Sequence, residues 1–241
     1  RVDRRRIYMC GVSMGGMGAW NMALRHPGMF AATTPIAGHT DMLKWWGWPA
    51  DKVPPFKKWL IEWDNPIDLV MNARGQHFFV QHGENDALIP AEQSRSIVAA
   101  AARLGIPIAY YEHKGSDHYI YWRTECFERA WSWQKQFFLR VARKIDFKTY
   151  SLEYDTAYWA RILRIRRWGL PAEIHVNADG GRIEVKCENV DAFGLDLSAA
   201  PQTPDAQVVV NGQVIAPKGK QGRWTIFELA PLPVKEGFPP P

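Results

Sequence analysis

The chain has 241 residues, of which 46% are hydrophobic and 23% charged, and its formal net charge is +5. This composition is ordinary for a globular protein with one large domain or two modest ones. No stretch approaches the roughly 20 apolar residues of a membrane span, and no nucleic-acid motif accompanies the mild positive charge. We therefore expect neither a membrane span nor nucleic-acid binding.

Strands and helices alternate over the first part of the chain. The expected strands are 7–12, 31–38, 77–83 and 106–112, and the expected helices are 16–26, 90–104 and 121–144. An irregular segment at 39–73 interrupts the alternation. Strands that alternate with helices predict a parallel sheet with helices on its faces.

The pattern changes near residue 146, after which short strands are separated by turns. The expected strands are 147–154, 158–166, 172–176, 182–187, 193–197, 207–214 and 224–229. The pair Asn211-Gly212 is a hairpin signal. We therefore expect two domains, an α/β domain at 1–145 and a small all-β sandwich-like domain at 146–241. The second ends in a Pro-rich tail from Pro231, expected to be extended or loose.

The run Gly11-Val12-Ser13-Met14-Gly15 is the most informative motif of the first domain. It follows a strand and opens a helix, which is the context of a nucleophile elbow. The positive end of the helix favours an oxyanion beside Ser13. The alternative is a Gly-rich strand-to-helix turn that has no catalytic role.

A serine nucleophile needs a base to take its proton and a third group to hold the base. Two loops that follow later strands reach the sheet edge expected to carry Ser13. The first loop offers Asp86 as the acid, with Glu84 as the rival carboxylate. His82, at the end of the preceding strand, is expected to be structural and to hydrogen-bond within the turn.

The second loop, 114–119, offers His118 as the base. His113 is the competitor, but it lies at the end of the strand, before the glycine that frees the loop. Asp117 adjoins His118, so its side chain is expected to point elsewhere. Asp68 falls in a pattern typical of a capped helix start and receives no catalytic role.

Taken together, these motifs resemble the esterase branch of the α/β-hydrolase superfamily. The similarity is to bacterial polyhydroxybutyrate-depolymerase-like, feruloyl-esterase-like and prolyl-oligopeptidase-like hydrolases, and it covers about residues 1–143. The stretches that carry it are Ser13-Met14-Gly15-Gly16-Met17-Gly18-Ala19-Trp20, His26-Pro27, Phe30-Ala31-Ala32, Pro35-Ile36-Ala37-Gly38, His82-Gly83-x-x-Asp86-x-x-Ile89-Pro90 and Gly115-x-x-His118.

The resemblance implies the C-terminal half of an α/β-hydrolase parallel sheet and a two-step acyl transfer. Ser13 attacks the carbonyl, His118 moves the proton, Asp86 orients His118, and the Met14 backbone N–H is one oxyanion donor. No metal or organic cofactor is implied. The expected substrate is a small-molecule or polymer-linked carboxylic ester, such as one on a polysaccharide or a phenolic. A prolyl-oligopeptidase-type peptidase and a non-catalytic binding protein that uses the β domain are the alternatives.

Members of this superfamily carry further strands before the elbow, and one of their loops supplies the second oxyanion donor. Here the elbow strand would be an apolar open edge, which proteins avoid. We expect either a preceding segment of a longer chain or a partner chain to cover that edge, and poor solubility and weak activity without it. The N-terminal residues are not informative about where in the cell the protein is located, so a secreted or periplasmic bacterial location is left open.

The interrupting segment at 39–73 is rich in tryptophan. Trp45, Trp46 and Trp48 are candidates for substrate contact, because insertions at this position often overhang the site. The alternative is that these rings only pack the segment onto the domain. We expect at least one tryptophan to lie near Ser13.

The three cysteines, Cys10, Cys126 and Cys187, are far apart and form no C-x-x-C pair. This spacing argues against a disulfide framework or a zinc site. Cys10 lies in the elbow strand and is expected to be a core residue.

Overall fold

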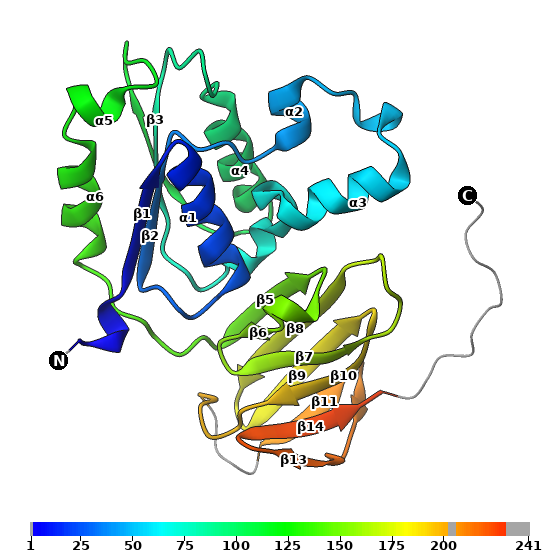
Figure 1. Ribbon diagram of the computed structural model, residues 1–241. Coiled ribbons are helices and arrows are strands. Elements are labelled where there is room, and N and C mark those ends of the chain that lie inside the picture. Colours follow the sequence, from blue (N-terminus) through cyan, green and yellow to red (C-terminus); the bar gives the residue numbers. More distant parts are fainter. Residues whose placement is uncertain (1, 202–205, 230–241) are drawn as a thin grey trace.

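The computed structural model describes residues 2–201 and 206–229. Figure 1 shows a parallel sheet flanked by helices, and below it two β-sheets packed as a sandwich. The Pro-rich tail expected from residue 231 lies outside the described residues. No helix in the described part of the chain is long and apolar enough to cross a membrane.

The first sheet has four parallel strands in the order β1-β2-β3-β4. Their bounds are β1 Tyr8–Val12, β2 Ala32–Ile36, β3 Phe79–Gly83 and β4 Ala109–His113. Helices α1 (Met14–Arg25) and α4 (Glu92–Arg103) cover one face, and α6 (Cys126–Gln134) covers the other (Figure 1). All five β2 residues are buried, as expected for a strand that has neighbours on both sides and helices on both faces. The α/β-hydrolase expectation for this half of the sheet is confirmed.

The core on the α1 side is built around two stacked rings. Trp20 of α1 and Phe78, just before β3, are fully buried with ring centroids 4.7 Å apart. Leu24, Leu69 and Ile97 belong to the same cluster. The apolar residues of α1 and α4 thus fix both helices against the strands that carry the site.

The Trp-rich insertion folds into short helices. These are α2 (Met42–Trp46), η2 (Ala50–Lys52), α3 (Pro55–Asp64) and η3 (Pro66–Ala73). The η3 segment buries Leu69, Val70 and Ala73, whereas α3 has no buried residue. Trp59 of α3 contacts Trp63 and also Trp168, which lies in the turn between β7 and β8.

The expected single helix at 121–144 is wrong. The chain forms α5 (Ile120–Arg123) and α6, separated where Thr124 turns extended and its hydroxyl binds the Ile120 carbonyl. Beyond α6, the Leu139 N–H donates to the Arg5 carbonyl at 2.8 Å. The Arg143 carbonyl accepts from Ala178 at 2.9 Å. These backbone groups are therefore bonded to distant segments and are not part of a helix ladder.

The C-terminal part is a β sandwich of two five-stranded sheets, β13-β14-β10-β7-β6 and β12-β11-β9-β8-β5. Inward-facing positions such as Phe147, Trp159 and Phe193 form one shared core. The strands are β5 Lys144–Thr149, β6 Thr156–Ala157, β7 Ala160–Ile165, β8 Ala172–Asp179, β9 Arg182–Glu188, β10 Val190–Leu195, β11 Gln207–Val210, β12 Gln213–Val214, β13 Gly219–Gln221 and β14 Trp224–Glu228.

The sandwich follows most of the strand pattern read from the sequence. Asn211 and Gly212 both have positive φ and join β11 to β12, as the hairpin signal predicts. Several details differ. The strand expected at 147–154 stops at Thr149 and is followed by η4 (Leu152–Tyr154), the strand expected at 193–197 runs from Val190 to Leu195, and β6 and β13 were not expected.

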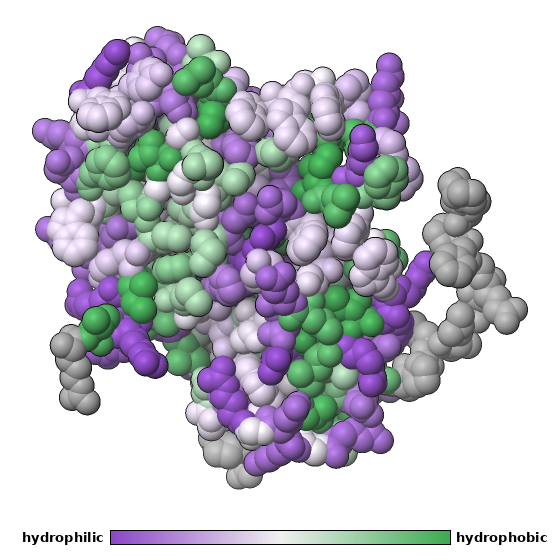
Figure 2. Space-filling model, viewed as in Figure 1, coloured by the Kyte–Doolittle hydropathy of each residue, from purple (hydrophilic) through white to green (hydrophobic). Residues whose placement is uncertain are grey.

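Cys10 is exposed, so its assignment to the core is wrong. Within the described residues β1 pairs only with β2, and its other edge has no strand beside it. Hydrophobic residues gather on the surface over β1 and α1 (Figure 2). Cys10 was assigned to the core because it lies in the apolar elbow strand, but its side chain is exposed among the described residues.

Candidate active site

The strand-to-helix turn at Ser13 has the backbone strain of a nucleophile elbow. Ser13 has φ 57° and ψ −118°, an uncommon conformation for a residue with a side chain. Its N–H donates to the Ile36 carbonyl at 2.9 Å, which ties the turn to the end of β2. A Cβ on Gly16 would lie 2.4 Å from the same carbonyl oxygen, so only glycine lets α1 approach β2 this closely. The strain is therefore held by packing against β2.

The acid is held by its own loop after β3. Asp86 is buried, and its Oδ1 accepts hydrogen bonds from the backbone N–H groups of Leu88 at 3.0 Å and Ile89 at 2.8 Å. This turn fixes the carboxylate and leaves Oδ2 directed at other partners.

The acid loop and the base loop are bonded to each other. Asn85 N–H donates to the Ser116 carbonyl at 2.9 Å, and Gly115 N–H donates to Glu84 Oε2 at 2.8 Å. A Cβ on Gly83 would lie 2.2 Å from the Asp117 carbonyl oxygen, so the contact requires glycine. The two loops thus come together at the carboxyl ends of β3 and β4.

Ser13, His118 and Asp86 form one chain of hydrogen bonds. The Ser13 Oγ lies 2.9 Å from His118 Nε2, and His118 Nδ1 lies 2.7 Å from Asp86 Oδ2. With the ring proton on Nδ1, the imidazole donates to Asp86 and accepts from the serine hydroxyl. Burial by itself would raise the pKa of Asp86, but hydrogen bonds from His82, the Ile89 N–H and His118 hold that pKa below its ordinary value. The carboxylate stays ionised opposite His118.

The competing residues are bonded elsewhere. His113 Nε2 lies 3.0 Å from the Gln81 side-chain oxygen, and Glu84 is the acceptor for Gly115. Asp117 points away from His118 and pairs with Arg123 at 2.7 Å, as expected. Asp68 accepts from the Asn65 amide at 2.7 Å, and burial raises its pKa. None of these four bonds reaches the serine.

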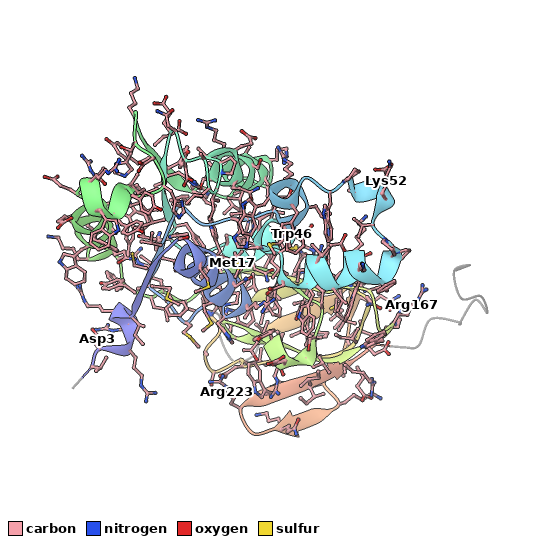
Figure 3. All side chains as sticks on the ribbon, turned by 45° about the horizontal axis from the view of Figure 1, so that its top comes forward. Asp3, Met17, Trp46, Lys52, Arg167 and Arg223 are labelled. Atoms are coloured by element: carbon pink, nitrogen blue, oxygen red, sulfur yellow. The ribbon has the colours of Figure 1, made fainter. Side chains whose placement is uncertain are left out.

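The insertion reaches the acid loop through one tryptophan. The Trp45 indole N–H donates to the Leu88 carbonyl at 3.1 Å, and its ring stacks on His39 with centroids 4.4 Å apart. The Gln93 side chain accepts from the Thr40 N–H at 2.8 Å, which fastens the start of the insertion to α4. In Figure 1, α2 lies beside α4 on the side toward which the strands of the parallel sheet point, and Figure 3 labels Trp46 of this helix.

Trp46 and Trp48 contact each other, with ring centroids 4.9 Å apart. Both are about half exposed. Met14, next to Ser13, is 78% exposed. As the first residue of α1, Met14 has no carbonyl one turn earlier in the helix for its N–H to bind.

Sequence reasoning placed His82 in the turn, and the structure confirms this. His82 Nε2 lies 2.7 Å from the Ile89 carbonyl oxygen. The structure adds a contact that was missed, because the same nitrogen lies 3.2 Å from Asp86 Oδ2. The four-residue separation of His82 and Asp86 in the sequence was the signal that could have predicted this contact.

This arrangement can carry out acyl transfer. His118 can take the Ser13 proton as the oxygen attacks a carbonyl, and Asp86 can stabilise the imidazolium that forms. The backbone N–H groups at the start of α1 favour negative charge there. Within residues 2–201 and 206–229 no group of three or more His, Cys, Asp or Glu side chains is placed to hold a metal ion.

Comparison with known proteins gives one family and several partial structural likenesses. The model of the prolyl oligopeptidase family matches residues 1–141. No curated protein matches the chain. A puromycin-hydrolyzing peptidase from Mycobacterium tuberculosis is 23% identical with a TM-score of 0.40, over 48% of this chain and 19% of that one.

Two further solved structures are similar to part of the chain. A thermostable esterase is 26% identical with a TM-score of 0.41, over 57% of this chain and 32% of that one. A putative dipeptidyl aminopeptidase IV from Bacteroides ovatus is 18% identical with a TM-score of 0.47, over 56% of this chain and 20% of that one. The chain thus spans at most about a third of the length of these solved proteins.

The family model covers more than half of the chain and includes the elbow and both loops. The parallel sheet and its flanking helices agree with that match. The chain belongs to the prolyl oligopeptidase family and carries part of the α/β-hydrolase fold.

Proposed function

We propose that the chain hydrolyses carboxylic esters through an acyl-enzyme on Ser13. His118 takes the serine proton as Ser13 Oγ attacks, and returns it to the departing alcohol. Water then attacks the acyl-enzyme as His118 takes its proton, the bond between the acyl carbon and Ser13 Oγ breaks, and His118 returns the proton to Ser13 as the carboxylic acid is released. Asp86 orients His118, and the Met14 N–H is one donor to the oxyanion. The hydrogen-bond chain Ser13–His118–Asp86 carries the proposal.

The surroundings of Ser13 support an ester with an apolar or aromatic acyl group. Met14 follows the nucleophile directly, Leu88 lies two residues after the acid, and both side chains are largely exposed. Trp45 adjoins Leu88 through its indole hydrogen bond. Such side chains contribute by burying apolar surface of the substrate, not by binding a charge.

The carboxylates of the two loops support an ester over a peptide trimmed from its end. Removal of terminal residues requires an anchor for the peptide's α-amino group. Glu84 is already bonded to the Gly115 N–H, and Asp117 is paired with Arg123. Cleavage within a peptide needs no such anchor, and the family match makes a serine peptidase the second candidate.

Two experiments test the reaction and the bond. A fluorophosphonate probe should phosphonylate Ser13, and the Ser13→Ala variant should not be labelled. A panel of short-chain, feruloyl and peptide substrates then compares kcat/KM. Ester turnover without peptide turnover supports the proposal, and peptide turnover alone selects the second candidate. A wild-type chain that is neither labelled nor active would overturn the hydrolase assignment in favour of a binding role.

The unpaired edge of β1 is expected to influence the activity that these experiments measure. We propose that a further strand covers it, from a preceding chain segment or from a partner chain, because an unpaired apolar edge invites association. We also propose that residues 1–145 and 146–241 act as separate domains, the first catalytic. Activity should rise when a covering segment is supplied in the same chain.

A further inference from the structure

His82 is wholly buried and every polar atom of its ring lies near a partner. Its Nδ1 lies 2.7 Å from Ser94 Oγ on α4, and its Nε2 lies 2.7 Å from the Ile89 carbonyl oxygen. The carbonyl can only accept, so the proton is on Nε2, and Nδ1 accepts from the Ser94 hydroxyl. The ring is fixed as one tautomer by two groups outside the catalytic hydrogen-bond chain.

The fixed Nε2–H also faces the catalytic acid. Asp86 Oδ2 lies 3.2 Å from this nitrogen and 2.7 Å from His118 Nδ1. The same oxygen therefore lies between two imidazoles, one from β3 and one from the base loop. The Asp86 Oδ1 is occupied by two backbone N–H groups, so four N–H groups face the carboxylate, and that of His82 is shared with the Ile89 carbonyl.

We propose that His82 is a positioning residue for the acid of the triad, setting both the direction and the charge of the Asp86 oxygen that faces His118. This inference rests on the proposed function. His82 touches no reacting atom. It acts through Asp86, and Ser94 acts through His82 by keeping the proton on Nε2.

The direction in which loss of His82 should change the pH dependence follows from the charge of Asp86. A donor on Asp86 Oδ2 withdraws part of the charge that would otherwise stabilise the imidazolium form of His118. Without that donor the carboxylate keeps more of its negative charge, and the acid limb of kcat/KM should move to higher pH. One hydrogen bond corresponds to a displacement of roughly half a pH unit to one unit.

Geometry gives a second effect. Without His82 the carboxylate loses one lateral contact and can rotate away from His118. A misplacement of about 1 Å in a catalytic group reduces turnover by up to about 100-fold. The loss should fall on kcat, because His82 does not contact the substrate.

A pH-dependent effect also depends on the other charged and titratable groups near His82 and Asp86. The titratable side chains that face Asp86 are His82 from β3 and His118 from the base loop. Glu112 of β4 is the next charge whose field reaches His82, and it is paired with Arg95 of α4 at 2.6 Å. The Glu112–Arg95 pair remains in every variant below.

The test compares His82→Leu, His82→Gln and a matched control, His113→Leu. His113 is also a buried histidine at the end of a strand, but its Nε2 is near Gln81 and not near the triad. We expect His82→Leu to lower kcat by about 10- to 100-fold with KM nearly unchanged, and to move the acid limb upward. His82→Gln retains an amide donor and should recover part of both losses, whereas His113→Leu should leave the acid limb in place.

Ser94→Ala provides a variant that leaves His82 itself intact. It should move the acid limb in the same direction by a smaller amount, because the Nε2–H tautomer is then less favoured. An unmoved limb in both His82→Leu and Ser94→Ala, with the wild type active, would overturn the inference alone. If His82→Leu does not fold, Ser94→Ala and His82→Gln decide. A wild-type chain that resists fluorophosphonate labelling would instead overturn the proposed function.

Discussion

The indole N–H of Trp45 donates to the carbonyl of Leu88, at 3.1 Å. Leu88 is in turn the residue whose N–H donates to the catalytic-acid candidate Asp86, at 3.0 Å. The Trp-rich insertion and the acid loop are therefore joined by a hydrogen bond. A substrate that contacts Trp45 would therefore lie next to the loop that holds the Asp86 carboxylate in place.

Replacing Trp45 with alanine should raise KM for an ester with an aromatic acyl group by roughly tenfold, the scale of one lost aromatic contact. The kcat value should change less, because the triad hydrogen bonds do not involve the indole. Steady-state kinetics on a feruloyl ester measure both. Trp131→Ala is the control, since Trp131 lies on α6, on the other face of the sheet, and is 58% exposed. An unchanged KM in Trp45→Ala, Trp46→Ala and Trp48→Ala would rule out the insertion as a substrate contact.

Loss of the nucleophile or the base should be severe. Ser13→Ala and His118→Ala should each lower kcat by about 10⁴- to 10⁶-fold, and the double variant should be little worse than either, because the two groups act as one unit. Single-turnover assays with an activated ester measure the rates. Additive losses in the double variant would show that Ser13 and His118 do not act together.

Two glycines of α1 should respond in opposite ways to alanine. Gly16→Ala should destabilise the fold by about 1–3 kcal/mol, because the new Cβ would meet the Ile36 carbonyl at 2.4 Å. A Cβ on Gly18 would meet no atom within 4 Å beyond its own stretch of helix, so Gly18→Ala should stabilise the helix by about 0.5–1 kcal/mol. Urea unfolding midpoints measure both. Equal effects of the two substitutions would contradict the close approach of α1 to β2.

A histidine of the β sandwich should make stability depend on pH. Hydrogen bonds from His175 to Asp146 and Glu173 raise the pKa of His175 to about 9. A raised folded-state pKa means that the stabilisation is complete below the unfolded value of about 6.5 and is lost as pH rises through about 9. Wild type should therefore exceed His175→Gln in stability most at pH 6 and converge with it above pH 9.

The two-variant comparison of urea midpoints from pH 6 to pH 10 measures this difference. Asp146 is also paired with Arg74, which lies after η3. This second pair is present in both proteins and cancels in the comparison. A difference that grows with rising pH would contradict the assignment of His175 as the titrating group.

The open edge of β1 should make the isolated chain self-associate and weaken its activity. Cys10→Lys places a charge on this exposed strand and should reduce association, since a lysine on an edge opposes strand pairing. Light scattering over a concentration series measures the oligomeric state. A fully active monomer from the unmodified chain would show that the edge needs no cover.

Much of the catalytic half could be predicted from local patterns. Ser13 follows a short apolar strand and opens a helix, and both loops follow apolar strands of the same kind. The carboxyl ends of parallel strands meet at one edge, so the order of Ser13, Asp86 and His118 along the chain was enough to bring them together. The choice of Asp86 over Glu84 depended on the motif and agrees with the observed hydrogen bond to His118.

Long-range contacts could not be predicted in this way. The apolar periodicity continued past Gln134, but the backbone there bonds to Arg5 and Ala178 instead of forming a helix. The second partner of Asp86, His82, depends on a ring orientation that Ser94 sets from another element. The exposure of Cys10 depends on what lies beside β1, which no pattern within β1 reveals.

The pairing of β3 with β4 places Gly83 opposite His113, and the acid and base loops leave from these two positions. Strand residues are about 3.3 Å apart, and a shift of one residue reverses the facing of every side chain. A single residue inserted into or deleted from either strand would therefore separate Asp86 from His118 by more than a hydrogen bond can span. The distance between the acid and the base is set by counting residues along two strands that contain neither of them.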